Sequence, residues 1–529
     1  MRAESRAWAG PGSVNAASVK PAWVRFVLPS GADLIFFAML GVLVLTPLSV
    51  RLLGDAGIGW HIRTGQEILA THSIPRVDSF SSTMAGKPWF AWEWLYDLTV
   101  GKLESEWGLN GVVWFTAMTI ALTFACTFRF LMARRTNVVL ALVLVLLAVS
   151  ASMIHFLARP HVVSWLFTLA WFYLLDGSER LSLKGRGGSP RWIFALSLLM
   201  LVWVNVHGGF LLGFVLLGIF LLGAGWTWFN TNENRIEEML QKIAAAKRMR
   251  SLAVVTLLSG VASLVNPYGW KLYGHVYGYL SNRFLMDHID EFQSPNFHGI
   301  AQKCFLLLLL ITVATVAIRG NELRLSQGLT ILLAVYAGLY ASRNIPVSSI
   351  LLVMIVGPLV PAARFTREFS QRMAAVETGL RGHLWPILAM VATFAVVANG
   401  GRVGSGVWMD AHFSNARMPV QAVNFLEEKQ VRGAILSPDY WGGYLIYRLY
   451  PMVRVVVDDR HDLYGEEFFK SYLKTMRVER GWEQFLMVHE SSVVLLPRDA
   501  ALANVLTETK GWKQIYADDV AVAFVRERF

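Results

Sequence analysis

Long apolar runs separated by short polar connections make up most of the chain between residues 34 and 400. A helix needs roughly 20 residues, mostly apolar, to cross the hydrocarbon core of a membrane. Several runs approach this length once their flanks are included, so the pattern predicts a polytopic α-helical membrane domain over residues 34–400 with about eleven transmembrane helices. The predicted spans are Leu34–Val50, Gly111–Leu131, Val138–Phe156, Val162–Leu175, Trp192–Val206, Phe210–Phe229, Leu252–Val265, Cys304–Ile318, Leu329–Tyr340, Ile345–Leu359 and Leu384–Val397.

Beyond about residue 400 the pattern changes to shorter elements with more charged positions. Helical periodicity alternates with short apolar runs that are typical of strands. Strands separated by helices indicate an α/β domain with at least a partly parallel sheet. We therefore predict a soluble α/β domain over residues 401–529, with strands at Gly433–Leu436, Val453–Val457, Ser492–Leu496, Trp512–Tyr516 and Val520–Val525.

The composition agrees with a membrane protein, since 55% of the residues are hydrophobic and the mean hydropathy is positive. The two cysteines, Cys126 and Cys304, lie inside apolar runs, so we expect neither a disulfide framework nor a thiolate metal site. A net charge of +11 would indicate a nucleic-acid partner in a soluble protein. Here the basic residues are scattered between the spans, as is typical of cytoplasmic loops, and no nucleic-acid partner is predicted.

The distribution of lysine and arginine predicts the orientation of the chain. If residues 1–33 form a cytoplasmic N-terminal segment, the connections on the cytoplasmic side hold 21 of these residues and those on the other side hold 10. Because basic residues concentrate in cytoplasmic loops, this favours a multi-pass protein of the cytoplasmic (inner) membrane. An odd number of spans then places a large loop, residues 54–109, and the C-terminal domain on the extracytoplasmic side.

Residues that could carry chemistry concentrate on the extracytoplasmic side. The stretch Gly54–Gly65 follows the first span and combines several glycines with an acid, an indole, an imidazole and a guanidinium. An acid beside a membrane exit is costly to dehydrate and usually has a partner or a purpose. Asp55 is therefore the first candidate for a reactive group. A polar residue at the end of a span can instead be an interfacial anchor, and this alternative stays open for each candidate.

Several motifs follow one another in order along the chain and share this side of the membrane. They are Asp55 with Trp60, His61 and Gly65, then Ile74–Ser81, Trp92–Leu95, Ala158–His161, Trp203–Phe210 and Ser342–Pro346. Together they resemble the bacterial membrane glycosyltransferases of the GT-C fold, in the group described as RgtA/B/C/D-like. The resemblance covers the membrane region and, more loosely, the C-terminal tail.

The resemblance implies transfer of a sugar, a hexosyl or pentosyl unit, from a polyprenyl-phosphate carrier. The acceptor would be an envelope glycan, lipid or protein on the extracytoplasmic face. In this class an acid of the first outer loop serves as general base toward the acceptor hydroxyl, and only Asp55 occupies that position here. An aspartate can accept the proton as the hydroxyl attacks the anomeric carbon. A single displacement of this kind would invert the anomeric centre.

The leaving group of such a reaction is a lipid phosphate, which cations stabilise. The candidates for binding it are Arg159 and Arg343, at the outer ends of spans, together with His161. Arginine offers a planar fork suited to phosphate oxygens, although each arginine could instead reach toward lipid headgroups. The candidates for contacts with the acceptor or the sugar are His61, Asp78, Glu93 and Glu291.

One departure from the class concerns a metal ion. Many of its members carry Asp-x-Asp or an adjacent pair of acids, sometimes with a divalent metal. This chain reads Asp55-Ala56-Gly57, so the second acid is missing. Hard divalent cations need several oxygen ligands. The sequence therefore leaves metal dependence open and weighs against it, and it indicates no other cofactor.

The C-terminal tail contains one further candidate segment, Asp458–Asp462. It follows a predicted strand, where α/β domains often bind ligands, so it could bind an acceptor or a cation. It could equally form an ion-paired turn. Two rival functions also remain open for the whole chain. One is a non-enzymatic transporter or scaffold for envelope polysaccharide, and the other is a polymerase of lipid-linked glycans.

Overall fold

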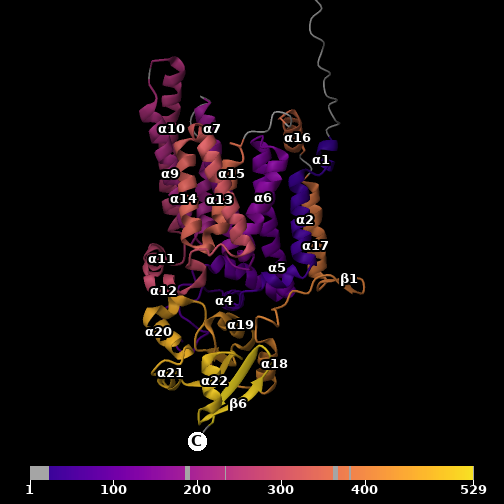
Figure 1. The fold of residues 1–529 in the computed structure, drawn as a ribbon, viewed down its shortest axis with the longest axis vertical. Helices are drawn as coiled ribbons and strands as arrows, with labels where there is room; N and C mark the ends of the chain where they lie inside the picture. Colours follow the sequence, from indigo (N-terminus) through magenta and orange to yellow (C-terminus); the bar gives the residue numbers. More distant parts are fainter. Residues whose placement is uncertain (1–22, 185–190, 233, 361–366, 381–382, 528–529) are drawn as a thin grey trace, which may run out of the picture.

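The computed structural model describes residues 23–184, 191–232, 234–360, 367–380 and 383–527. Most of the predicted cytoplasmic N-terminal segment, residues 1–22, lies outside this part of the chain. A long helical bundle occupies one end of the molecule and an α/β region occupies the other (Figure 1). The main helices of the bundle are α2 (Gly31–Leu45), α5 (Trp94–Ala133), α6 (Val138–Ser152), α7 (His161–Leu183), α8 (Ala195–Trp203), α9 (Phe210–Asn230), α10 (Ile236–Ser263), α13 (Ile300–Arg319), α14 (Leu325–Tyr340), α15 (Ile345–Val356) and α17 (Leu384–Ala398).

Each predicted apolar run overlaps one helix of this bundle. Within the described residues, five helical stretches are long and apolar enough to cross a membrane, and a bent helix pair near residues 368–398 would make a sixth. Three further apolar helices, at Arg191–Trp203, Leu325–Tyr340 and Ser342–Val356, are shorter. The chain is therefore a helical membrane protein, as predicted, whereas the number of eleven spans stays a prediction.

The first bundle helix shows how local sequence defines an element. The Ser30 hydroxyl accepts a hydrogen bond from the Asp33 amide at 3.1 Å, and the Asp33 carboxylate accepts one from the Ser30 amide at 2.8 Å. This capping box satisfies two amide donors that the first turn of a helix leaves free. Helix α2 then continues through an apolar run until Thr46-Pro47 ends it, since proline disfavours helical geometry in the residue before it.

A buried ion network ties the bundle together at the end opposite the α/β region. Asp176 of α7 pairs with Arg134, which directly follows α5, and with Arg324, which precedes α14. Glu179, one turn further along α7, lies 2.8 Å from Arg324 and 2.9 Å from Arg248 of α10. Buried charges persist only when they are paired. The network therefore ties four segments of the bundle to one another.

A layer of short helices separates the bundle from the α/β region. It comprises α3 (Leu48–Leu52), α4 (Ile58–Thr71), α11 (Lys271–Ser281) and α12 (Arg283–His288). Helix α4 lies between the bundle and the α/β region (Figure 1), packed against α5 on one side and α19 (Asp439–Leu449) on the other. A side chain at Gly59 would collide with the backbone of Gly443 in α19. Glycine therefore permits the close approach of these two helices.

The C-terminal region has the partly parallel sheet that the sequence predicts. Its strands are β3 (Gly433–Leu436), β4 (Val453–Val455), β5 (Ser491–Pro497), β6 (Trp512–Ala517) and β7 (Ala521–Arg526), in the spatial order β4-β3-β5-β7-β6. Strand β3 pairs in parallel with β4 and β5, whereas β7 pairs antiparallel with β5 and β6. The accompanying helices are α18 (Val420–Glu428), α19, α20 (His461–Met476), α21 (Trp482–Val488) and α22 (Ala501–Glu508).

Candidate active site

Asp55 lies in the turn between α3 and α4, directly before the helix that separates the bundle from the α/β region (Figure 1). One carboxylate oxygen accepts a hydrogen bond from the Gly57 amide at 2.8 Å, which fixes the side chain within the turn. The other oxygen lies 3.3 Å from Nε of Arg159. The carboxylate is 30% exposed, so it stays open to a reactant while it is held by a cation.

Arg159 precedes α7 and joins Asp55 to the C-terminal region. Its Nη1 lies 3.0 Å from a carboxylate oxygen of Asp459, in the loop between β4 and α20. The other oxygen of Asp459 accepts a hydrogen bond from the Trp60 indole at 3.0 Å. Burial raises the pKa of Asp459 to about 6, with the nearby Asp55 adding to the rise and Arg159 opposing it. Two carboxylates from opposite ends of the sequence thus share one guanidinium.

Arg343 forms a second cationic position, in the turn Ser342–Asn344 that joins α14 to α15. Its Nη1 lies 3.1 Å from Glu291, and its guanidinium stacks on the Phe292 ring with 4.4 Å to the centroid. Loss of solvent raises the pKa of Glu291, but the charges of Arg343 and Arg159 outweigh this and lower it to about 2. The charges of both arginines therefore act on the same carboxylate, although only Arg343 contacts it.

Two histidines brace this part of the site. His161 contacts the backbone carbonyl of His155 through Nε2 at 2.9 Å, and His155 contacts that of Ser342 at 3.1 Å. These bonds link the start of α7 to the turn that carries Arg343. His161 was a candidate for binding phosphate. Its Nε2 is used for this internal contact, so positioning of the turn is the role that its geometry supports.

Glu93 lies at the start of α5 between two imidazoles. Its two carboxyl oxygens lie 3.9 Å from Nε2 of His61 and 3.8 Å from Nε2 of His207. Burial raises the pKa of Glu93 to about 8, despite the opposing charges of Arg159 and Arg343. Burial also lowers the pKa of His207 to about 3. At neutral pH this carboxyl is therefore protonated and His207 is neutral.

The raised pKa of Glu93 predicts how stability depends on pH. An unfolded chain releases this proton near pH 4.5, whereas the folded protein holds it until about pH 8. Between these values the folded state loses about 1.4 kcal/mol per pH unit relative to the unfolded state, because only the folded state keeps the proton. Glu93→Gln is expected to melt above the wild type at about pH 9 and close to it at about pH 4. Thermal scans in lipid nanodiscs test this, and a difference that does not change with pH would contradict it.

Two of the predicted contact residues, Asp78 and His61, are deeply buried in this structure. Asp78 is 2% exposed, and it pairs with Arg460 at 2.8 Å and accepts hydrogen bonds from Ser81. His61 is 1% exposed and contacts Asp97 through Nδ1 at 2.5 Å. Contacts of these two residues with the acceptor or the sugar stay a prediction. Through Arg460, Asp78 holds the outer loop against the C-terminal region. His61 lies beside Glu93 in the interior of the protein.

The segment Asp458–Asp462 forms the ion-paired turn that was one of its two predicted alternatives. Asp458 and Arg460 form a buried bidentate ion pair, which is the predicted turn. Asp459 points the other way, to Arg159. The remaining two residues attach the loop to its surroundings, since His461 lies 2.8 Å from Asp439 and Asp462 lies 2.9 Å from His275 of α11.

Sequence reasoning missed the role of Asp97 and the contact of Asp459 with Arg159. Asp97 follows Glu93 by four residues, so the two acids lie one helical turn apart and both face His61. That spacing was visible in the sequence. The approach of Asp459 was not, because 300 residues separate it from Arg159.

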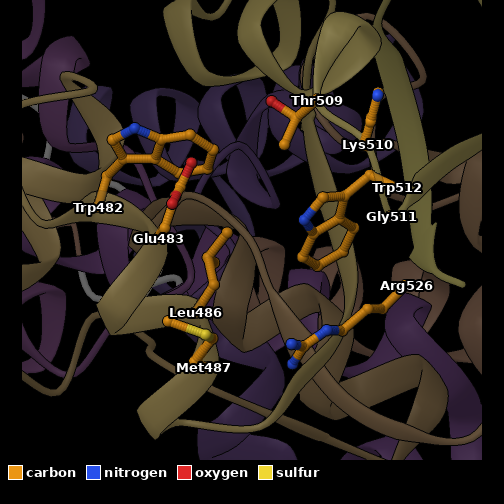
Figure 2. A pocket seen from close by; sticks show the side chains of 9 residues that line it. All are labelled: Trp482, Glu483, Leu486, Met487, Thr509, Lys510, Gly511, Trp512 and Arg526. Carbon is orange, nitrogen blue, oxygen red and sulfur yellow. The ribbon is translucent and has the colours of Figure 1, made fainter. Parts of the chain in front are cut away.

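A separate hollow of about 180 Å³ lies in the C-terminal region, between α21 and the β6–β7 edge of the sheet. Figure 2 shows the indoles of Trp482 and Trp512 on different sides of it, with Glu483 beside the first and Arg526 below the second. Its lining includes neither Asp55 nor either arginine of the site. The hollow is therefore a feature of the α/β region alone.

No protein-family model matches the chain, and no curated protein sequence matches it significantly. Solved structures do. An oligosaccharyltransferase from Archaeoglobus fulgidus, tethered to an acceptor peptide with an NVT sequon, matches over 94% of this chain and 73% of its own, with a TM-score of 0.52 and 10% identity. ArnT from Cupriavidus metallidurans, bound to undecaprenyl phosphate, matches over 93% and 96%, with a TM-score of 0.44 and 13% identity. The similarity to the oligosaccharyltransferase confirms the GT-C-like fold that the sequence predicts.

Proposed function

We propose that this protein is a membrane glycosyltransferase that moves a sugar from a polyprenyl-phosphate carrier to an acceptor on the extracytoplasmic face. The observation that carries the proposal is the partly exposed Asp55 held against Arg159 at one end of the bundle. An acid and a cation side by side provide the two functions that the reaction needs. One accepts a proton from the acceptor, and the other stabilises the negative charge of the leaving phosphate.

The chemistry follows a single displacement. Asp55 removes the proton from the acceptor hydroxyl as its oxygen forms a bond to the anomeric carbon. The bond between that carbon and the phosphate oxygen breaks on the opposite face, and the polyprenyl phosphate leaves with the electron pair. The anomeric centre is inverted. Arg159 and Arg343 bind the phosphate, because guanidinium N–H groups pair well with phosphate oxygens.

We assign two carboxyl groups to contacts with the sugar or the acceptor. Glu93, which is protonated at neutral pH, can donate a hydrogen bond to a hydroxyl group. Glu291 is 38% exposed beside Arg343 and, as a carboxylate, can accept one. The transferred unit is a hexosyl or pentosyl group, and the acceptor is an envelope glycan, lipid or protein.

The orientation belongs to the same proposal. The N-terminus is cytoplasmic and the C-terminal region extracytoplasmic, in the inner membrane. The bias of lysine and arginine supports this, and so does the position of the loop helices α4, α11 and α12, which lie at the same end of the bundle as the α/β region (Figure 1). The organisation is a segment 1–33, a transmembrane domain 34–400 and an α/β domain 401–529.

Lipid-linked sugars in a deletion strain test the function. Loss of a transferase is expected to leave its polyprenyl-phosphate sugar unused, so this donor accumulates and one sugar is missing from an envelope component. Complementation with the wild-type chain should reverse both changes. An unchanged donor pool with a mislocalised polysaccharide would instead indicate a transporter or scaffold. Accumulation of short lipid-linked repeat units would indicate a polymerase.

A further inference from the structure

The GT-C resemblance carries the expectation of two neighbouring acids, in some members with a divalent metal between them. In this chain the second acid is absent from the sequence motif but present in space. Asp459, from the C-terminal region, approaches the same place as Asp55, and the two carboxylates contact one guanidinium at 3.0 and 3.3 Å. A positive charge of the protein itself thus lies between the two acids.

Gly57 shows that the guanidinium fills the space of the missing acid. A Cβ atom at this position would collide with Nη1 of Arg159 and with a carboxylate oxygen of Asp459. An aspartate here, as the Asp-x-Asp pattern would require, is therefore incompatible with the arrangement. The second acid is absent from the motif because Arg159 occupies the space that its side chain would need.

The residues around this position do not fit a divalent ion. Such ions need several oxygen ligands at short distances. Across the part of the chain that the structure describes, no group of three or more histidine, cysteine, aspartate or glutamate side chains could hold one. The two acids that could begin such a site already contact Arg159.

We propose that the Arg159 guanidinium, clamped between Asp55 and Asp459, is the resident cation of this site and takes the position that a divalent metal would occupy. Asp459 is then a positioning residue that the C-terminal region supplies. The guanidinium suits this role because it is permanently charged and has five N–H donors, so it can pair with two carboxylates and still face a phosphate. One guanidinium offsets only one of the two negative charges, so the phosphate also needs Arg343.

The metal-ion part of this proposal stands on geometry, and the phosphate part rests on the proposed function. Two measurements keep them apart. The first is manganese binding to the purified full-length protein in nanodiscs, followed by electron paramagnetic resonance of free Mn²⁺. The wild type is expected to bind no manganese at this site. One bound ion per chain that is lost in both Asp55→Asn and Asp459→Asn would overturn the proposal. Manganese retained in both variants lies elsewhere and leaves the assignment of Arg159 standing.

The second measurement is binding of undecaprenyl phosphate to the same preparations, with and without EDTA. EDTA is expected to leave the affinity unchanged. Arg159→Gln should weaken binding by about tenfold or more, since it removes a charge-assisted hydrogen bond. Asp459→Asn should not weaken binding, because the asparagine oxygen can still accept a hydrogen bond from Arg159 and keep it in place, while a competing negative charge is removed. Asp519→Asn, at a fully exposed acid, is the matched control.

Each result of this second measurement has a distinct meaning. Weaker binding in Asp459→Asn, or binding that EDTA abolishes, would overturn the role of Arg159 as the cation. If Asp459 had a purely structural role, Asp459→Asn would lower both the affinity for undecaprenyl phosphate and the melting temperature. The proposal instead predicts that the affinity does not fall. If undecaprenyl phosphate bound to no preparation, the proposed function would fail, and the manganese measurement would still decide which cation occupies the site.

Discussion

Replacing Asp55 with asparagine is expected to reduce sugar transfer at least about a hundredfold, because a general base contributes roughly 10²–10⁴ to a rate. The substitution changes charge but little else. The asparagine oxygen can still accept the hydrogen bond that Asp55 accepts from the Gly57 amide at 2.8 Å. The turn before α4 should therefore keep its shape. The measurement is transfer from a polyprenyl-phosphate sugar by the purified protein in nanodiscs.

Asp410→Asn is the matched control, since this acid is 75% exposed and lies far along the chain, in the connection between β2 (Gly406–Val407) and α18. It should transfer sugar at the wild-type rate. Equal melting temperatures for the three proteins would show that folding is unaffected. Wild-type transfer by Asp55→Asn would remove this residue from the mechanism.

Arg460→Met is expected to destabilise the attachment of the C-terminal region by about 3–5 kcal/mol, the range found when one partner of a buried ion pair is removed. Arg460 is 2% exposed and pairs with Asp458 at 2.7 Å and Asp78 at 2.8 Å. Its guanidinium also lies over the Trp89 ring, 4.7 Å from the centroid. Methionine fills similar space but leaves two buried carboxylates without their cation.

Thermal scanning and limited proteolysis of the full-length protein measure this loss. The stability loss in Arg460→Met should also depend on pH. Burial raises the pKa of Asp78, but the charge of Arg460 outweighs this and lowers it. Without Arg460 the carboxylate gains a proton more readily, so the defect should shrink as the pH falls. Arg454→Met, at an exposed position in β4, is the control. Equal melting temperatures for the two variants would contradict the structural role of Arg460.

The sequence predicted the architecture well because architecture depends on local pattern. Apolar runs long enough to need a membrane or a packing partner can be read from the sequence alone, and each overlaps a helix of the bundle. Short apolar runs between helical segments likewise marked the strands of the C-terminal sheet. Asp55, Arg159 and Arg343 became candidates through the motifs that contain them, and their roles stay predictions.

The remainder of the site depends on contacts between distant segments. Nothing near Asp78 in the sequence shows that Arg460 buries it, and nothing near Gly57 shows that Arg159 fills its space. The glycines of Gly54–Gly65 resembled a loop, yet most of this stretch is the helix α4. Gly59 is required there by the backbone of Gly443, which only the folded chain brings near.

The most direct measurement is a structure of the protein in lipid nanodiscs with a bound polyprenyl phosphate. The phosphate is predicted to contact the guanidiniums of Arg159 and Arg343, with the lipid chain leaving along the bundle and the Asp55 carboxylate open beside the phosphate. Phosphate density at the opposite end of the bundle, beside Asp176 and Glu179, would contradict the assignment of the site. So would a structure in which Arg159 and Arg343 face away from the bound phosphate.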